Sequence, residues 1–424
     1  MGEIRVLHAA DLHVDSPLRG LPAYEGAPTE DVRAATRAAL ENLVEAAVEH
    51  AVHLVVIVGD LYDGRWNDYA TGLFVTAQFA RLGEAEIPVA LVYGNHDAES
   101  KITAKLRLPP NTRAFSSKRA ETQVYEDLGI ALHGQSYQNP ACTNDLAAGY
   151  PEAVPHMVNI GLLHTALDGR PGHAPYAPCS LDELRAKGYE YWALGHVHKR
   201  EVLATDPHVV FPGNLQGRDV GETGAKGATL ITFADGDVTL EPLVLDAVRW
   251  ERAEVDVSAA GSLDDCLDAC SDSLALLAGG LDRTCALRIR LAGETTADTT
   301  LRANPDHVLQ ELRALALDCH GANFLVEKLE LATQAPRGTC LLAGEGPAGE
   351  IGRVLAEAQE NLADLHDAGN ADLAALGALR AKLAAQDSEL GTLALGDEEL
   401  AEALKDASAL LATRLGFSGG SDAA

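Results

Sequence analysis

The sequence lacks the features of a membrane protein or a secreted protein. It has no uninterrupted run of about 18 apolar residues, which a membrane-spanning helix requires. Its first residues, "MGEIRVLHAADLH", follow a strand pattern without the basic segment, apolar stretch and cleavage site of a signal peptide. The seven cysteines are odd in number and include no CxxC pair, which argues against a disulfide framework. We expect a cytoplasmic protein with reduced thiols and no membrane association.

Basic residues are also scarce. Lys and Arg total 33 against 63 Asp and Glu, which gives a formal net charge of −30. Because phosphate contacts need Lys and Arg, this balance argues against indiscriminate binding of nucleic acid. Any contact with DNA must therefore be local. By contrast, 47% of the 424 residues are hydrophobic, which is ample for a sizeable core, and the length favours two or three domains.

The first 247 residues show the pattern of an α/β domain. Short runs rich in Val, Ile and Leu, such as "HLVVIVGD" and "IPVALVYG", alternate with helical stretches at 32–51 and 69–82. This alternation is typical of a sheet with parallel central strands. Near the end of the domain, Asp235 and Gly236 form a common turn pair and predict an antiparallel hairpin. We place this domain at residues 1–247.

The rest of the chain divides into two parts. Residues 248–337 show three strand patterns separated by helical patterns at 262–278 and 305–317, which predicts a small α+β domain. Residues 338–424 are rich in Ala, Leu and Glu and predict a helical C-terminal region. Within it, apolar residues recur at spacings of three and four over 349–366, so this helix has one apolar face.

Polar side chains of metal-ligand type follow several apolar strands of the first domain. The motifs "DLH", "GDLYD", "GNHD", "GLLH" and "GHVH" occur in this order, each at the end of a predicted strand. In open α/β sheets the carboxyl ends of the strands border the ligand crevice, so we expect one cluster. Its members are Asp11, His13, Asp60, Asp63, Asn95, His96, Asp97, His164, His196 and His198.

The residue types in this cluster favour a pair of metal ions. Imidazole, carboxylate and amide ligands without thiolate suit a divalent ion such as manganese, iron or zinc. The ligands exceed the need of one ion, and a central carboxylate can bridge two ions about 3.5 to 4 Å apart. A single histidine at a strand end is more often a hydrogen-bonded structural residue, and we interpret His8 and His133 in this way. That interpretation does not explain five ordered motifs.

The ordered motifs resemble those of the calcineurin-like metallophosphoesterase superfamily over most of residues 4–200. The segments "VYGNHDAES", "YWALGHVHKREVL" and "FPGNLQGRDVGETGAKGATLI" are similar to the SbcD-type DNA repair exonucleases and, among them, to the YhaO-like branch. This extends the resemblance to about residue 245. The fold that it implies is an α/β metallophosphoesterase β-sandwich flanked by helices, with the small α+β domain as a capping domain.

The resemblance also implies a role for each side chain. Asp60 would bridge two divalent ions, for which Mn²⁺ is the expected metal. His96 would stay unligated and act at the scissile phosphate as an acid or as an electrostatic stabiliser. Asp63 and Asp97 would orient the ligand histidines. The other implied ligands are Asp11, His13 and His198 for the first ion, and Asn95, His164 and His196 for the second.

The predicted reaction is hydrolysis of a phosphate ester, because two cations neutralise the phosphate charge and activate a water molecule for in-line attack. A basic segment bears on which ester is cleaved. Six basic residues and no acidic one lie between Ser100 and Ala120, directly after "GNHD". A solvated loop is the alternative, but this position favours contact with a DNA backbone. The predicted DNA contacts are Lys101, Lys105, Arg107, Arg113, Lys118, Arg119 and Arg218.

Three functions remain open at this point. The first is a DNA exonuclease or endonuclease in repair; the resemblance then implies an SMC-like ABC ATPase held by the C-terminal helices, and a homodimer. The second is a metallophosphoesterase for a small or protein-bound phosphate, which would hydrolyse chromogenic diesters and ignore DNA. The third is a DNA-repair scaffold with a silent metal site, against which the complete ligand set argues.

Overall fold

The computed structural model describes two compact units of the chain. The C-terminal region predicted at 338–424 lies outside the described residues. The described residues are 3–16, 18, 21, 29–64, 69–99, 106–169, 174–321 and 323–336. The first unit comprises Met1–Glu251, Leu281–Leu287 and Ala322–Glu327, and the second contains 252–280, 288–321 and 328–336. Because the first unit also includes segments beyond residue 280, no single position in the sequence separates the two units. The predicted domain boundary after residue 247 therefore stays a prediction.

The first unit contains a six-stranded sheet in the order β12-β11-β1-β2-β3-β4. Strands β1 to β4 are parallel neighbours, and β11 pairs antiparallel with β1 and with β12. The predicted hairpin is confirmed, because Asp235 and Gly236 join β11 to β12 with positive φ angles of 52° and 91°. The strands are β1 (Ile4–Ala9), β2 (Leu54–Val58), β3 (Val89–Val92), β4 (Thr112–Ala114), β11 (Gly227–Ala234) and β12 (Asp237–Val244).

A second six-stranded sheet has the order β5-β6-β7-β8-β10-β9. Its four central strands are parallel, and the outer strands β5 and β9 pair antiparallel with β6 and β10. Parallel central strands were predicted for this domain. The strands are β5 (Glu121–Tyr125), β6 (Ile130–Gly134), β7 (Val158–His164), β8 (Tyr191–Gly195), β9 (Glu201–Thr205) and β10 (His208–Phe211).

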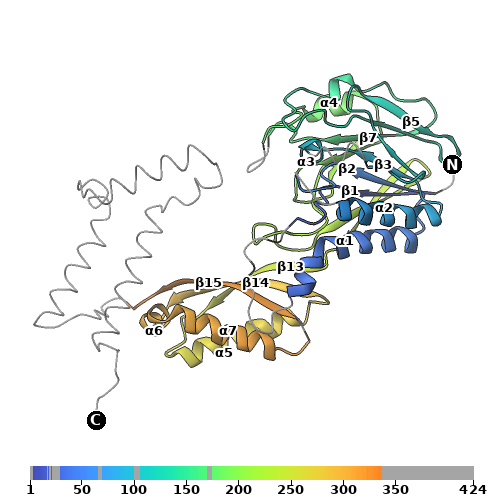
Figure 1. Cartoon of the computed structure of the whole chain (residues 1–424). Helices are drawn as coiled ribbons and strands as arrows, with labels where there is room; N and C mark the ends of the chain where they lie inside the picture. The colour runs from blue at the N-terminus through green and yellow to red at the C-terminus, as the bar shows by residue number, and fades with distance from the viewer. Residues whose placement is uncertain are drawn as a thin grey trace, which may run out of the picture. The chain divides into compact units, whose positions relative to one another are not determined.

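The two sheets pack face to face with helices outside. In β2, Val56 faces the core between the sheets, whereas Val55 and Ile57 pack beneath the helices. Every residue of this strand is buried, which explains why its sequence is continuously apolar rather than alternating. Helices α1 (Thr29–Glu49) and α2 (Tyr69–Glu84) cover the first sheet (Figure 1), while the short α4 (Leu181–Ala186) packs on the second.

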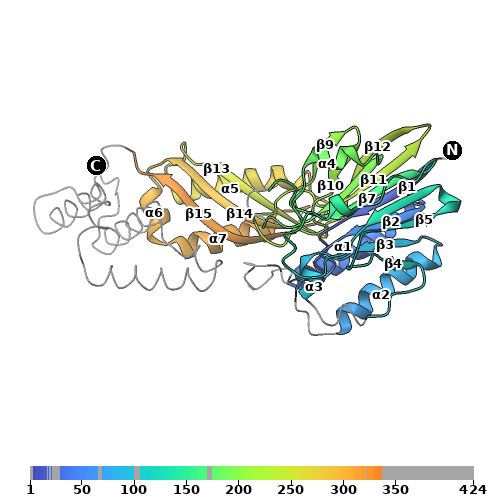
Figure 2. The same ribbon diagram turned by 90° about the horizontal axis from the view of Figure 1, so that it is seen from above.

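A smaller sheet and three helices complete the described chain (Figure 2). The sheet has the order β13-β14-β15, and its elements follow one another as predicted, with the short α6 in addition. The six described cysteines are free thiols, and none of the described helices is both long and apolar enough to cross a membrane. The elements are β13 (Val248–Asp256), α5 (Leu263–Ala278), β14 (Thr284–Glu294), α6 (Asp298–Ala303), α7 (Pro305–Asp318) and β15 (Phe324–Gln334).

Candidate metal centre

The carboxyl ends of five strands, three from one sheet and two from the other, deliver the cluster. Strands β1, β2 and β3 end before "DLH", "GDLYD" and "GNHD". Strand β7 ends with "GLLH", and β8 ends at the glycine that begins "GHVH". The potential ligand atoms form three groups, each within 4.8 Å: Asp11, His13 and His198; His13, Asp60 and His96; and Asp60, His164 and His196. The groups overlap, so they form one continuous site.

Asp60 occupies the position expected of a bridging carboxylate. Its Oδ1 accepts a hydrogen bond of 3.0 Å from the backbone N–H of His96. Its Oδ2 lies 3.4 Å from Nε2 of His164 and 3.9 Å from Nε2 of His13. One oxygen is therefore held by the backbone, and the other lies between the two sides of the cluster.

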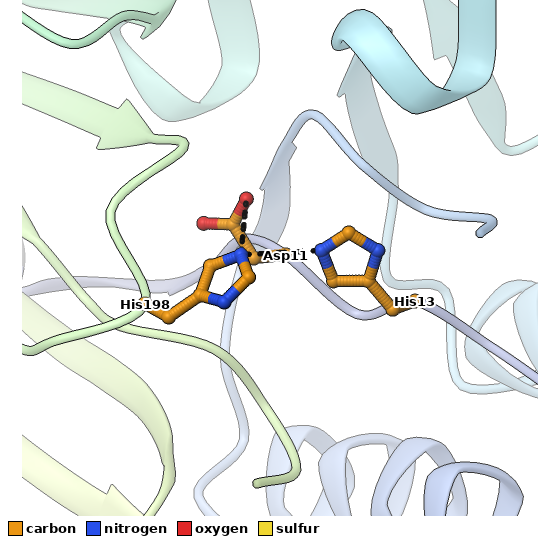
Figure 3. A group of neighbouring side chains, drawn as sticks. All are labelled: Asp11, His13 and His198. Atoms are coloured by element: carbon orange, nitrogen blue, oxygen red, sulfur yellow. Dashed lines mark hydrogen bonds and ion pairs between the residues drawn. The ribbon is translucent and has the colours of Figure 1, made fainter. Parts of the chain in front are cut away.

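Figure 3 shows the first side of the cluster, where Asp11, His13 and His198 point toward one another. The Nε2 atoms of the two histidines are 3.2 Å apart, and Nε2 of His198 is 3.9 Å from Oδ1 of Asp11. Nδ1 of His198 is 2.6 Å from Oε1 of Glu222. The carboxylate accepts a hydrogen bond from the Nδ1–H group, so Nε2 of His198 carries the lone pair that a metal ion requires.

The second side of the cluster also brings acceptor atoms together. Nδ1 of His164 donates to the backbone carbonyl of Val58 at 3.0 Å. Its Nε2 therefore presents a lone pair to Oδ1 of Asn95 at 3.0 Å and to the Asp60 carboxylate. Nε2 of His196 donates to the carbonyl of Ala174 at 3.1 Å, which leaves the lone pair on Nδ1. Facing acceptors need a cation between them, so this set fits a divalent ion.

The pKa values indicate that a proton on His164 balances the charge of Asp60 when no ion is bound. Burial by itself would lower the pKa of His164, but the charge of Asp60 and the hydrogen bond to it raise the pKa to about 9. Burial lowers the pKa of His13 to about 3, so this imidazole is neutral and ready to ligate. In the metal-free chain at neutral pH, a proton on His164 therefore balances Asp60.

We expect metal binding at pH 7.5 to release about one proton, because His164 must lose its proton before it can ligate. The affinity of the second position should rise with pH and level off as the pH passes about 9, the value to which the pKa of His164 is raised. Titration calorimetry in buffers of different ionisation enthalpy measures the released protons. Binding without proton release would contradict the assignment of His164 as a ligand.

Four of the candidate ligands have strained backbones. The φ angles are 51° at Asp11, 43° at His13, 50° at Asp60 and 99° at His196. L-residues rarely adopt such angles, and each costs on the order of 1–3 kcal/mol. Surrounding contacts hold this geometry. For example, Asp11 accepts hydrogen bonds of 3.1 and 2.9 Å at its two oxygens from the backbone N–H of His196. The ligands are thus fixed before any ion binds.

Two motif glycines allow the strands to approach the cluster closely. A Cβ atom at Gly94 would overlap Oδ1 of Asp60, and one at Gly195 would overlap the carbonyl oxygen of Val58. The first glycine begins "GNHD" and the second begins "GHVH". The glycines of these motifs are therefore required by packing around the ligands.

His96 differs from the buried ligands in its exposure. Its side chain is 36% exposed, whereas those of His13 and His164 are 1% and 0% exposed. Nδ1 of His96 lies 3.4 Å from Oδ1 of Asp63, and the same oxygen lies 3.6 Å from Nδ1 of His13. Asp63 thus contacts the candidate ligand His13, as expected, and also contacts His96, the more exposed of the two imidazoles.

Asp97 acts differently from the prediction that it orients a ligand histidine. The short helix α3 (Asn95–Glu99) turns its carboxylate toward the backbone instead. The carboxylate accepts hydrogen bonds from the N–H groups of Leu61, Tyr62 and Gly94 at 3.2, 3.0 and 2.9 Å. Asp97 therefore fixes the two loops that carry Asp60 and Asn95, because buried N–H groups need a partner.

The predicted DNA contacts fall into three classes. Lys101 and Lys105 lie outside the described residues. Arg107, Arg113, Lys118 and Arg119 are exposed. Because β4 runs parallel to β3, Lys118 and Arg119, which follow β4, lie at the sheet edge that carries Asn95.

Arg218, the last predicted DNA contact, is placed elsewhere. Its side chain is only 21% exposed and lies between Asp63 and Glu222. Two carboxylates therefore hold the guanidinium group beside the first side of the cluster, and contact of Arg218 with DNA stays a prediction.

Sequence reasoning missed two residues of this site. One is Glu222, the partner of His198. The other is Tyr137, whose hydroxyl donates to the carbonyl of His164 at 2.7 Å and whose ring packs edge-on to its imidazole. The only sequence signal was the position of Glu222 shortly after "PGNLQGR".

The chain is similar to several known proteins. The calcineurin-like phosphoesterase family matches residues 4–200, and the middle domain of metallophosphoesterase YhaO matches 250–334. An uncharacterized metallophosphoesterase, YhaO from Bacillus subtilis, is 34% identical over 313 residues, which cover 73% of this chain and 76% of that protein.

More distant similarities were also found. The DNA double-strand break repair protein Mre11 of Sulfurisphaera tokodaii is 26% identical over 261 residues, 58% of this chain and 64% of that protein. A dimetal phosphatase from Danio rerio superposes with a TM-score of 0.33 and 11% identity over 56% of this chain and 95% of that one.

Proposed function

Because the chain belongs to the calcineurin-like metallophosphoesterase family, we propose that it hydrolyses DNA phosphodiesters as an SbcD-type nuclease. The observation that carries the hydrolase part is the overlap of the ligand groups at Asp60. Oδ2 of this carboxylate faces His13 on one side and His164 on the other. Members of this family use a dinuclear centre, and Mn²⁺ is the metal that we propose here.

The side chains of the cluster have different proposed roles in catalysis. Metal ions bound there would neutralise the phosphate charge and lower the pKa of the attacking water. His96 is proposed to protonate the leaving oxygen, because its ring reaches the surface while Asp63 holds its Nδ1. The buried acceptors Asp11 and Asn95 fix the remaining ligand positions, so the substrate meets a preorganised site.

Two observations support DNA as the substrate. Lys118 and Arg119 follow β4 at the edge of the sheet that carries the centre. The similar protein from Sulfurisphaera tokodaii is named for double-strand break repair. The net charge of −30 favours the alternative, a small or protein-bound phosphate ester. An SMC-like ABC ATPase partner, a homodimer, a role in repair and a cytoplasmic location belong to the nuclease proposal.

A paired assay tests the proposed function. The purified full chain is incubated with Mn²⁺ and labelled linear duplex DNA, and in parallel with a chromogenic phosphodiester. Metal-dependent cleavage of both supports the nuclease. Cleavage of the diester but not of DNA, with and without an SMC-like ATPase, would identify the alternative.

Removing charge at the sheet edge should impair DNA cleavage selectively. We expect the double variant Lys118→Gln, Arg119→Gln to reduce kcat/KM on DNA. The slope of log kcat/KM plotted against the logarithm of the salt concentration should become less negative by up to about 2. Hydrolysis of the chromogenic diester should stay unchanged, because this small substrate does not reach these side chains.

A matched double variant controls for lost charge. Arg81 near the end of α2 and Arg185 in α4 are also exposed. Helix α2 leads into the amino end of β3 and α4 into the amino end of β8, whereas the centre lies at the carboxyl ends of these strands. Replacing both with Gln should leave DNA cleavage unchanged. An equal loss on the chromogenic diester in the Lys118, Arg119 variant would refute DNA contact at this edge.

A further inference from the structure

Arg218 bridges two carboxylates beside the first side of the cluster. Its Nη2 is 3.4 Å from Oε1 of Glu222, and its Nη1 is 3.7 Å from Oδ1 of Asp63. The backbone N–H of Arg218 also donates to Oε2 of Glu222 at 2.8 Å. The guanidinium group therefore spans two acids that come from different loops of the first unit.

Each of these acids contacts the Nδ1 atom of a candidate ligand histidine. Glu222 accepts from His198 at 2.6 Å, and Asp63 lies 3.6 Å from His13. Asp63 also lies 3.4 Å from Nδ1 of His96. Arg218 is thus connected to His198 through Glu222 and also directly, because its Nη2 lies 3.3 Å from Nδ1 of His198. Through Asp63 it is connected to His13 and to the proposed proton donor His96.

Glu222 is itself held by several donors. Its Oε2 accepts from Nδ2 of Asn214 at 2.8 Å as well as from the backbone of Arg218. Asn214 is fully buried. The position of the carboxylate is therefore fixed from the protein side, which leaves Oε1 to set the tautomer and the ring orientation of His198.

We propose that Glu222 and Arg218 are positioning residues for the first metal ion and for His96. Glu222 keeps the proton on Nδ1 of His198, so Nε2 faces the ion. Arg218 joins Glu222 to Asp63 and thereby couples the ligand histidines to the orientation of the proton donor. This inference rests on the proposed dinuclear centre and is independent of whether DNA is the substrate.

Substitutions of Glu222 should weaken metal binding, whereas substitution of Arg218 should lower kcat. Glu222→Ala should weaken binding of one of the two ions by about 10 to 100-fold. Glu222→Gln should weaken it less, because its amide oxygen can still accept from His198. Arg218→Lys keeps the charge but cannot span two acids with one ammonium group, so it should lower kcat with little change in KM.

The experiment combines metal binding and kinetics on the chelator-treated full chain. Mn²⁺ titration calorimetry gives the two dissociation constants. Hydrolysis of a dialkyl phosphodiester, whose alkoxide leaving group needs protonation by His96, gives kcat and KM. Glu311→Gln is the matched control, because Glu311 lies 3.7 Å from Nδ1 of His307 and both side chains are exposed on α7. It should change neither measurement.

Each outcome decides the proposal. Selective weakening of one ion in the Glu222 variants, with partial rescue by Gln and a lower kcat in Arg218→Lys, supports it. Unchanged metal affinity in Glu222→Ala overturns it. A raised KM with unchanged kcat in Arg218→Lys would make this residue a substrate contact instead. Failure of the wild-type chain to bind Mn²⁺ would overturn the dinuclear centre as well. This outcome is distinguishable from failure of the positioning proposal alone, because the Glu311→Gln control would also fail to bind Mn²⁺.

Discussion

Asp60→Ala should abolish hydrolysis of every substrate, because this variant removes the carboxylate that both sides of the cluster share. Oδ2 of Asp60 faces His13 and His164, and Oδ1 holds the backbone of His96. Loss of both ions removes several kcal/mol of transition-state stabilisation. We expect kcat/KM to fall by roughly 10³-fold or more, since about 1.4 kcal/mol corresponds to a factor of ten.

Metal content and activity should be measured together for this variant. Mass spectrometry of the native chain, or elemental analysis after gel filtration, should show fewer than two ions per chain. Asp182→Ala provides the control, because that side chain is 92% exposed on α4, and it should keep both ions and full activity. An Asp60→Ala chain that retained two ions and a tenth of the activity would disprove the bridging assignment.

His96→Ala should retain both ions, unlike Asp60→Ala, and should lose turnover of DNA. The exposed imidazole is proposed to protonate the leaving oxygen, and general acid catalysis typically contributes about 10² to 10⁴-fold. A p-nitrophenolate leaving group needs little protonation, whereas a DNA alkoxide needs much. The loss of kcat should therefore be large on DNA and small on a p-nitrophenyl diester.

The comparison of leaving groups separates the two roles that the sequence left open for His96. Equal losses on both substrates would identify an electrostatic stabiliser of the phosphate rather than an acid. Loss of a metal ion in His96→Ala would show instead that the histidine is a ligand, since it lies within ligand distance of His13 and Asp60.

The sequence predicted the regular elements that have a clear period. The expected helices at 32–51 and 69–82 correspond to α1 (Thr29–Glu49) and α2 (Tyr69–Glu84), and the continuous apolar runs correspond to strands buried on both faces. The outer strands β5 and β9 were not predicted. Both are short and half exposed, so their side chains follow no strong apolar pattern.

The ligand cluster was predictable because parallel strands end at one edge of a sheet. Its supporting residues were not. Glu222 reaches His198 from a loop of irregular backbone, where no sequence period indicates which side chains meet. Arg218 resembled a DNA contact by its charge alone, and its position between two acids depends on the packing of separate loops. The carboxylate of Asp97 similarly depends on the turn of one short helix.

The origin of the ligands in both sheets has a consequence for how long the protein survives in a cell. Asp60 and Asn95 follow strands of one sheet, whereas His164 and His196 follow strands of the other. An ion held by these residues would link the two sheets, and an unfolded chain offers no such site. At a free-ion concentration 100 times the dissociation constant, each ion adds about 2.7 kcal/mol to folding stability by mass action. We therefore expect a sufficient supply of divalent metal to increase the resistance of this protein to heat and proteolysis.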